Sequence, residues 1–240
     1  QSGWAAPAMA SIVDALFLSD DELVLVNNGY RADEPFLSLA PWDDVGRGQV
    51  VRLKRNGGCE VLAAGLCCPM GVAQDERGEL IVSEFERARI LDMSGAVRGA
   101  GYPGYLGRLR RHAGGYVLSA WARRDPLIEF LKTERRFVEE MKQTIATRHW
   151  IAPRISPEFS HDFPIELGAT RLFGEIKPWA PSFSYGLVLA LDERLTPTGS
   201  AQSRANGRRH AVSDALVWRG DLIAASLASG ELINLGAGLA

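Results

Sequence analysis

A short extended segment carries three side chains whose chemistry suits a polar organic ligand. Glu175, Lys177 and Trp179 alternate along the chain, and period-two spacing in an extended segment places all three on one face. A carboxylate, an ammonium and an indole could together hold such a ligand by ion pairing and stacking. The alternative is a rigid connector whose indole packs on a neighbouring element and whose Glu–Lys pair lies on the surface. Trp121 and Tyr185 would complete an aromatic wall around the ligand.

Three further polar residues are candidates for proton transfer. Glu84 ends one run of strand-forming residues, and His210 and Asp214 border the start of another. A carboxylate or an imidazole within hydrogen-bond reach of a substrate can act as a general acid or base. We therefore predict Glu84, His210 and Asp214 as catalytic residues, with a purely structural histidine as the alternative for His210.

The sequence lacks the spacings that bind metals or dinucleotides. The four histidines show no HxxxH or HExxH spacing, and Cys59, Cys67 and Cys68 form no CxxC pair. A GxGxxG match begins at Gly99, but the residues after it read as a strand, whereas phosphate binding needs a helix N-terminus there. We therefore predict no metal and no cofactor. Buried, unpaired thiols favour a reducing compartment, which predicts a cytoplasmic location.

Composition limits the class of protein. The 240 residues suffice for one large all-β domain, and 46% apolar with 23% charged residues is an ordinary globular balance. A net charge of −2 argues against nucleic acid as the main partner. No apolar run approaches the roughly 20 residues that a membrane helix needs, so we predict no membrane span.

One pattern recurs four times along the chain. An apolar-alternating run is followed by a short acidic or glycine-rich turn and then by a second, more apolar run, as a β-hairpin requires. The second runs of these hairpins begin at Leu23, Leu80, Tyr116 and Leu222. Further strand candidates follow most hairpins, which gives four strands per unit and predicts a β-propeller. The fourth unit offers only three strands before the chain ends.

The third unit contains a long excursion at residues 122–183. Within it, residues 126–147 carry apolar side chains at 3.6-residue spacing on one face, which predicts a helix. Two roles are open for this helix: a structural brace across one face of the propeller, or a lid over a pocket.

Several short motifs occur in an order that resembles a known family. They are Cys67-Cys68-Pro69-Met70-Gly71, Tyr102-Pro103-Gly104, the segment His149–Pro153 and the run Lys177–Gly186. Over residues 11–235 the sequence resembles the strictosidine synthase-like propellers, which are related to the SMP-30/gluconolactonase-like propellers.

The resemblance implies a six-bladed type of all-β propeller with four strands per blade, a central pocket for a small organic molecule and a helical insertion in one blade. On this reading, residues 1–240 form a single partial propeller domain of about four blades, with the upstream blades absent from this chain. An open propeller edge would then be available for self-association.

The residues that carry the known chemistry of these families are replaced here. Ser213 stands where the synthase glutamate would lie, and its neighbour Asp214 points to the opposite strand face. Met70 and Gly104 occupy positions where the lactonase propellers place metal ligands. The sequence therefore predicts a metal-independent hydrolase- or synthase-type enzyme, lactonase- or esterase-like, of unknown substrate. The alternative is a non-catalytic small-molecule-binding or sensing domain of a larger protein.

Overall fold

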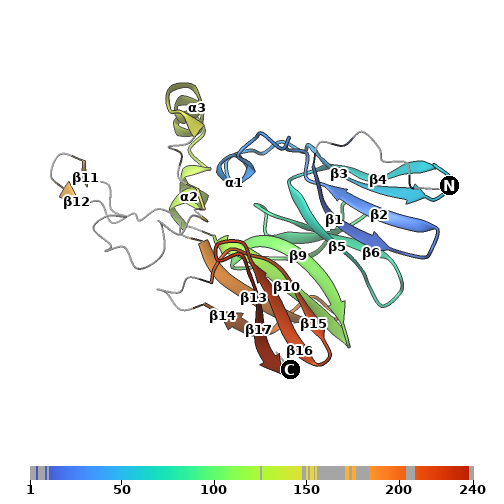
Figure 1. Ribbon diagram of the computed structural model, residues 1–240. Helices are drawn as coiled ribbons and strands as arrows, with labels where there is room; N and C mark the ends of the chain where they lie inside the picture. The colour runs from blue at the N-terminus through green and yellow to red at the C-terminus, as the bar shows by residue number, and fades with distance from the viewer. Residues whose placement is uncertain are drawn as a thin grey trace.

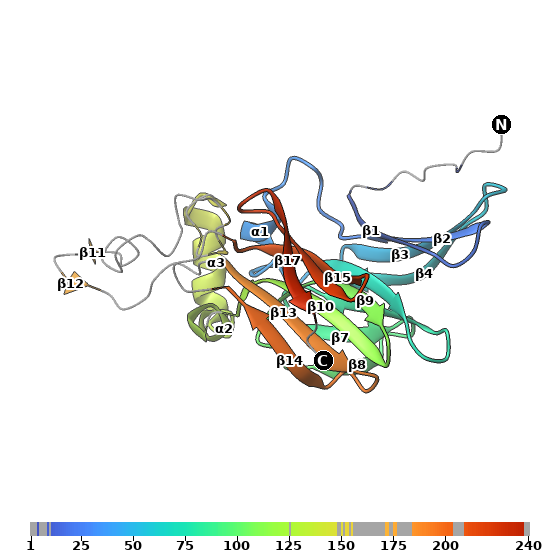
Figure 2. The same ribbon diagram turned by 60° about the horizontal axis from the view of Figure 1, so that its bottom comes forward.

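The computed structural model describes residues 4, 9, 11–124, 126–147, 150, 152–153, 155, 171–172, 175–176, 184–203 and 209–237. Within this part of the chain, consecutive antiparallel strands build three four-stranded sheets and one three-stranded sheet. Figure 1 shows the sheets fanned beside one another, and Figure 2 shows the same arrangement from a second side.

The first sheet contains β1 (Ile12–Phe17), β2 (Glu22–Asn27), β3 (Gly48–Lys54) and β4 (Cys59–Leu66). The second contains β5 (Pro69–Gln74), β6 (Leu80–Glu84), β7 (Arg89–Asp92) and β8 (Val97–Ala100). The third contains β9 (Gly104–His112), β10 (Gly115–Arg123), β13 (Ser184–Asp192) and β14 (Pro197–Gln202). The fourth contains β15 (Val212–Trp218), β16 (Asp221–Ser226) and β17 (Glu231–Ala237). A separate strand pair is formed by β11 (Arg171–Leu172) and β12 (Glu175–Ile176).

An aspartate closes several of the turns between these strands. Asp75, Asp92 and Asp192 each accept backbone N–H hydrogen bonds through Oδ1 from the residues two and four positions later, at 2.8 to 3.0 Å. Such Asx turns reverse the chain locally, because the side chain takes the place of a backbone acceptor. The turn residues in the sequence therefore fix hairpins at these positions before any sheet packs on another.

Apolar side chains fill the spaces between neighbouring sheets. Val24, Val50 and Val82 belong to a cluster between the first and second sheets, and Ile90 with Leu118 belongs to one between the second and third. A third cluster joins the third and fourth sheets. Full burial of a Val or Leu side chain contributes about 1.5–3 kcal/mol, so face-to-face packing is the main source of stability.

The innermost strands β1, β5, β9 and β15 meet around a network of charged side chains. Arg110 donates to Asp14 Oδ1 and Oδ2 at 2.7 and 2.9 Å, and to Asp214 Oδ1 and Oδ2 at 3.1 and 2.9 Å. Arg108 adds an ion pair with Asp214 at 3.2 Å. Asp14 also accepts the backbone N–H of Val72 at 3.0 Å. The network thus joins strands from all four sheets and balances two carboxylates with two guanidinium groups.

Close approach of two inner strands requires a glycine. A Cβ at Gly71 of β5 would lie 2.6 Å from Cα of Arg108 in β9, which is shorter than any ordinary van der Waals contact. Gly71 therefore lets the second and third sheets meet at their inner edge.

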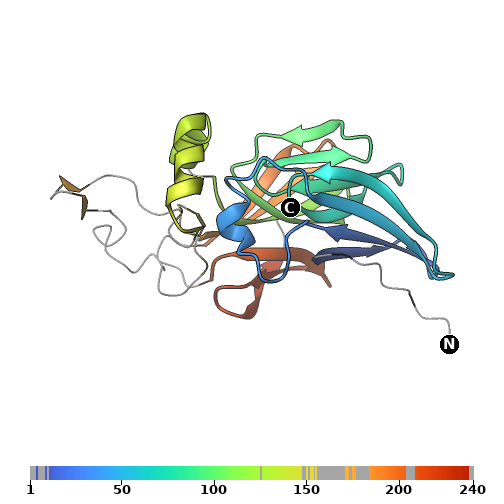
Figure 3. The ribbon, with the colours of Figure 1, turned by 90° about the horizontal axis from the view of Figure 1, so that it is seen from above.

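Helices gather at one end of the sheets. They are α1 (Phe36–Leu39), α2 (Pro126–Leu131) and α3 (Arg135–Thr144), and Figure 3 shows all three at the same end. Phe36 of α1 makes edge-to-face contacts with Phe85 and Trp121, at 6.0 and 5.6 Å between ring centroids. The following loop places Trp42 in a buried cluster with Ile128 and Met141, so α1 and its loop connect the sheets to α2 and α3.

The single helix predicted over residues 126–147 is wrong in detail, because the structure has two helices there. The chain turns at Lys132–Glu134, where the hydroxyl of Thr133 donates to the carbonyl of Phe130 at 2.7 Å. The break at residues 132–134 lets Ile128 of α2 and Met141 of α3 join one buried cluster with Trp42.

The predicted all-β propeller is confirmed, with four blades of consecutive antiparallel strands, the last of them three-stranded in the described residues. The first and fourth blades expose large apolar side chains, including Phe17, Val61, Trp218 and Leu232. Self-association through an open propeller edge stays a prediction. No described helix has the length and apolar character needed to cross a membrane.

We predict that Arg110→Met lowers the free energy of unfolding by about 3–5 kcal/mol, since the change leaves the buried Asp14 carboxylate without its main counter-charge. Urea denaturation measures this change. The matched control is Arg31→Met, which removes an exposed pair with Asp33 and is expected to change the free energy of unfolding much less, because solvent screens the exposed pair. Equal effects of the two substitutions would contradict a structural role for the inner network.

Candidate functional site

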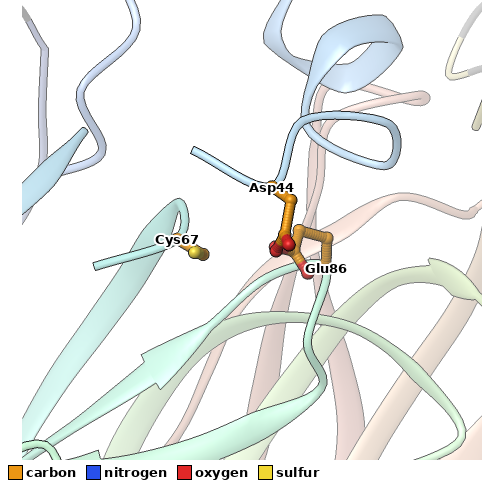
Figure 4. Close-up of side chains that lie close together, drawn as sticks. All are labelled: Asp44, Cys67 and Glu86. Carbon is orange, nitrogen blue, oxygen red and sulfur yellow. The ribbon is translucent and has the colours of Figure 1, made fainter. Parts of the chain in front are cut away.

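Three chemically active side chains meet at the end of the sheets that the helices cover. They are Asp44 from the loop after α1, Cys67 from the turn between β4 and β5, and Glu86 from the turn between β6 and β7. Their nearest ligand atoms all lie within 4.8 Å of one another. Figure 4 shows the two carboxylates side by side, with the Cys67 sulfur facing them. We call this group the acid–thiol cluster.

Burial dominates the electrostatics of the acid–thiol cluster. Cys67 and Glu86 are each only 3% exposed, whereas Asp44 reaches solvent. Burial raises the pKa of the Glu86 carboxyl to about 7; the charges of Lys132 and Arg87 oppose that rise, and those of Glu84 and Asp44 add to it. Burial also raises the pKa of the Cys67 thiol to about 11. At neutral pH the thiol is therefore protonated, so it is not an activated nucleophile.

One cation and one unsatisfied oxygen stand out beside the cluster. The guanidinium of Arg87 donates a short hydrogen bond to Asp44 and forms an ion pair with Glu86 Oε1 at 3.5 Å. The second oxygen, Glu86 Oε2, is buried and has no hydrogen-bond partner in the described part of the chain. An unsatisfied buried carboxylate oxygen costs free energy, and such groups occur at binding and catalytic sites.

A glutamate behind the cluster fixes the backbone that presents Cys67. Glu84 accepts the Cys67 N–H at 2.7 Å through Oε1 and the Nε–H of Arg89 at 2.5 Å through Oε2. The next residue, Cys68, has φ of +48°, a left-handed conformation that is strained for a residue with a side chain. Its carbonyl accepts the Phe85 N–H at 3.0 Å. These bonds hold a strained turn in the form that points Cys67 at the two carboxylates.

A cavity of about 490 Å³ opens next to the cluster. The acids Asp44 and Glu86 lie on one side, and Lys132 and Arg135 lie on the helical side. Trp42 adds an aromatic wall. Asp43, Glu139 and Lys142 also line the cavity, so its walls are mostly charged and suit a polar rather than an apolar ligand.

Other hollows have different linings. One of about 530 Å³ borders Asp214, Trp218 and Leu232 on the outer face of the fourth blade. A larger one, of about 620 Å³, lies at His112 and Leu222. Neither contains an acid–thiol cluster, so the cavity beside Glu86 is the strongest candidate for chemistry.

The structure places the predicted site residues in different surroundings. Glu84 lies directly behind the acid–thiol cluster through its bond to Cys67. Trp121 lies at the same end of the sheets, buried in a cluster with Cys68 and Phe85. Both residues therefore contact or pack near the chain segments that carry the cluster, but neither lines the cavity itself.

The other two predicted catalytic residues belong neither to the acid–thiol cluster nor to the lining of its cavity. Asp214 belongs to the inner-strand ion network with Arg108 and Arg110. His210 is buried before β15, where its carbonyl accepts the Ser226 hydroxyl at 2.7 Å. Catalytic roles for Glu84, His210 and Asp214 stay predictions.

The remaining predicted ligand-binding residues are Glu175, Lys177, Trp179 and Tyr185. Lys177 and Trp179 lie outside the described residues. Glu175 falls in β12 and Tyr185 in β13, but their side chains also lie outside what the structure describes.

Sequence reasoning missed Asp44, Cys67 and Glu86. A signal for two of them existed, because Pro69 pairs with Glu84 in the β5–β6 hairpin. Residues just before Pro69 and just after Glu84 must therefore lie side by side, which brings Cys67 to Glu86. No local signal could place Asp44, which arrives from a loop of the first blade.

No family model matches the sequence, and no curated protein matches it. Among solved structures, a presumed gluconolactonase aligns with a TM-score of 0.47 at 15% identity, over 97% of this chain and 61% of that chain. The WD40 β-propeller domain of Doa1 aligns with a TM-score of 0.42 at 10% identity, over 98% of this chain and 73% of that chain. This chain thus spans about three-fifths of the first neighbour's length.

These neighbours are propellers of two different kinds, and similarity at this level carries no argument about function. The propeller assignment rests on the four sheets themselves. The naming after strictosidine synthase stays a prediction.

We predict that Glu84→Gln destabilises the protein by about 2–4 kcal/mol, because it removes the negative charge that the Cys67 N–H and Arg89 both contact. Thermal and urea denaturation measure the loss. Glu231→Gln is the matched control, since Glu231 pairs with Arg209 on the surface, and its effect on stability should be much smaller because solvent screens that pair. A loss no larger than that of the control would show that Glu84 does not hold the strained turn.

Proposed function

We propose that the protein is a hydrolytic enzyme that acts on a small polar ester or lactone in the cavity beside Glu86. The observation that supports it is the buried Glu86 carboxylate, whose Oε2 has no partner and which borders a cavity of about 490 Å³. In this proposal the Glu86 carboxylate turns an oxygen to the cavity and there binds and orients the water that attacks a carbonyl carbon.

The opposite wall of the cavity supplies the complementary charge. Hydrolysis of an ester develops negative charge on the carbonyl oxygen, and a fixed cation close to that oxygen lowers the barrier. Lys132 and Arg135 lie on the cavity wall formed by the helices. In this proposal they face the developing oxyanion, while Glu86 acts from the side of the sheets.

The helical segment forms the roof of this site. Lys142 of α3 pairs with Asp43 at 3.2 Å. The ring centroids of Trp42 and Phe137 lie 6.4 Å apart. These contacts tie α3 to the loop that carries Asp44. Of the two roles open from the sequence, the proposal favours the helices as a lid, which limits the entry of bulk water.

We predict that the full chain hydrolyses at least one member of a panel of small esters and lactones, and that Glu86→Gln lowers kcat/KM by about 100-fold or more. The substitution keeps the size of the side chain, so the melting temperature should change little. Glu140→Gln is the matched control, because Glu140 is exposed on α3 and is not part of the cavity lining. The kcat/KM of this control should stay within about twofold of the value for the unsubstituted protein.

The panel also contains amine–aldehyde pairs, which test the synthase-type reading. Turnover of these pairs alone would replace hydrolysis by condensation. Saturable binding of panel members without turnover would support the non-catalytic sensing domain instead. An active Glu86→Gln variant would contradict the role given to this carboxylate.

A further inference from the structure

The donor atoms of the acid–thiol cluster have the composition of a metal site. Asp44 and Glu86 offer carboxylate oxygens, and Cys67 offers sulfur, from three separate segments of the chain. We infer that these three side chains bind one divalent ion of the zinc class. The sequence predicted no metal, because residues so far apart have none of the short spacings that mark zinc motifs.

Geometry permits this ion with small side-chain movements. The three ligand atoms lie within 4.8 Å of one another, and Figure 4 shows the Cys67 sulfur directed toward the two neighbouring carboxylates. Ligands of a tetrahedral zinc ion, bound at about 2.0 Å by oxygen and about 2.3 Å by sulfur, are about 3.3–3.5 Å apart. The cluster therefore has to contract by up to about 1.3–1.5 Å, through rotation of all three side chains, of which the exposed Asp44 is the freest to move.

A second observation points to a ligand at this place. Glu86 is 3% exposed, and its Oε2 has no hydrogen-bond partner in the described part of the chain. A buried carboxylate oxygen needs a proton donor or a cation to offset its lost hydration. A metal ion bound among the three side chains would satisfy this oxygen directly.

Donor type decides which metals fit. A thiolate is a poor ligand for the hard ions Ca²⁺ and Mg²⁺ but a good one for zinc-class ions. Three protein ligands leave a fourth position open, as in catalytic zinc sites. This set differs from the positions of Met70 and Gly104, where the resemblance would place ligands, so the site uses other residues and another class of metal.

The bound ion would change the protonation of the cluster. The Cys67 thiol must release its proton to solvent when its sulfur forms a bond to the metal, so binding becomes tighter as pH rises. A fourth position on the ion would be open to a water molecule. Use of that water for hydrolysis rests on the proposed function, whereas binding of the ion does not.

Arg87 is a built-in competitor for the ion. Its guanidinium contacts Asp44 and Glu86, so it offsets part of their negative charge when no ion is present. Metal binding must displace this guanidinium or leave it close to another positive charge. Removal of Arg87 should therefore tighten metal binding, an effect that an adventitious surface site would not show.

The test measures binding of Zn²⁺ and Co²⁺ to the chelator-stripped full chain by calorimetry and absorption spectroscopy. We expect one equivalent to bind, with a thiolate-to-cobalt charge-transfer band for the Co²⁺ form. Cys67→Ser should abolish this band, and both Cys67→Ser and Glu86→Gln should weaken binding by roughly 100-fold, since even outer partners of metal ligands are worth about 10–100-fold. Arg87→Gln should tighten binding by about tenfold.

Cys59→Ser is the matched control, because Cys59 is the exposed free thiol, and it should leave both band and affinity unchanged. The inference is overturned if the protein does not bind one equivalent of metal, or if Cys59→Ser abolishes the charge-transfer band. The readout needs no substrate, so its outcome is separate from that of the hydrolysis assay. If the chelator-stripped protein hydrolyses a substrate but binds no metal, the proposed function is supported and the metal site is rejected.

Discussion

The ion network among the innermost strands is the constraint that the remaining architecture depends on. Asp14 and Asp214 lie between Arg108 and Arg110, with distances of 2.7 to 3.5 Å. Burying charge is costly unless each group is paired, so strands β1, β9 and β15 can approach only in the register that completes all pairs. Hydrophobic packing between sheets tolerates small displacements, whereas this network does not. It therefore selects one arrangement of blades from several that would bury similar apolar area.

The position of the candidate site follows from that arrangement. Once the inner edges are fixed, the turns that precede β5 and follow β6 lie at the end covered by α1. Glu84 and Arg89 then hold the turn that contains Cys67 and the strained Cys68. The loop after α1 adds Asp44, and Trp42 anchors that loop to α2 and α3. The cluster is thus assembled from parts that are each stabilised by a separate set of contacts.

The two charge clusters of the molecule differ in a way that bears on function. In the inner network, two guanidinium groups balance two carboxylates, and every carboxylate oxygen has a partner. At the acid–thiol cluster, one guanidinium serves two carboxylates, and Glu86 Oε2 has no partner in the described residues. A network in which every charge is paired stabilises the fold, whereas a network with an unpaired oxygen can still bind a ligand or an ion. This contrast separates Asp214, which the sequence marked as catalytic, from Glu86, which it did not.

The sequence by itself determined the hairpins and the four blades, because alternation of apolar residues and aspartate turns act within a few residues of chain. It also marked Glu84 as a strand-end carboxylate, since the end of a strand can be read locally, but its catalytic role stays a prediction. Only the tertiary structure decided that Asp214 joins an ion network, that residues 126–147 fold as two helices, and that Asp44, Cys67 and Glu86 meet. These outcomes depend on contacts between segments far apart in the chain. The charge pairing of the inner strands fixes some of these contacts, and the burial of Trp42 fixes others.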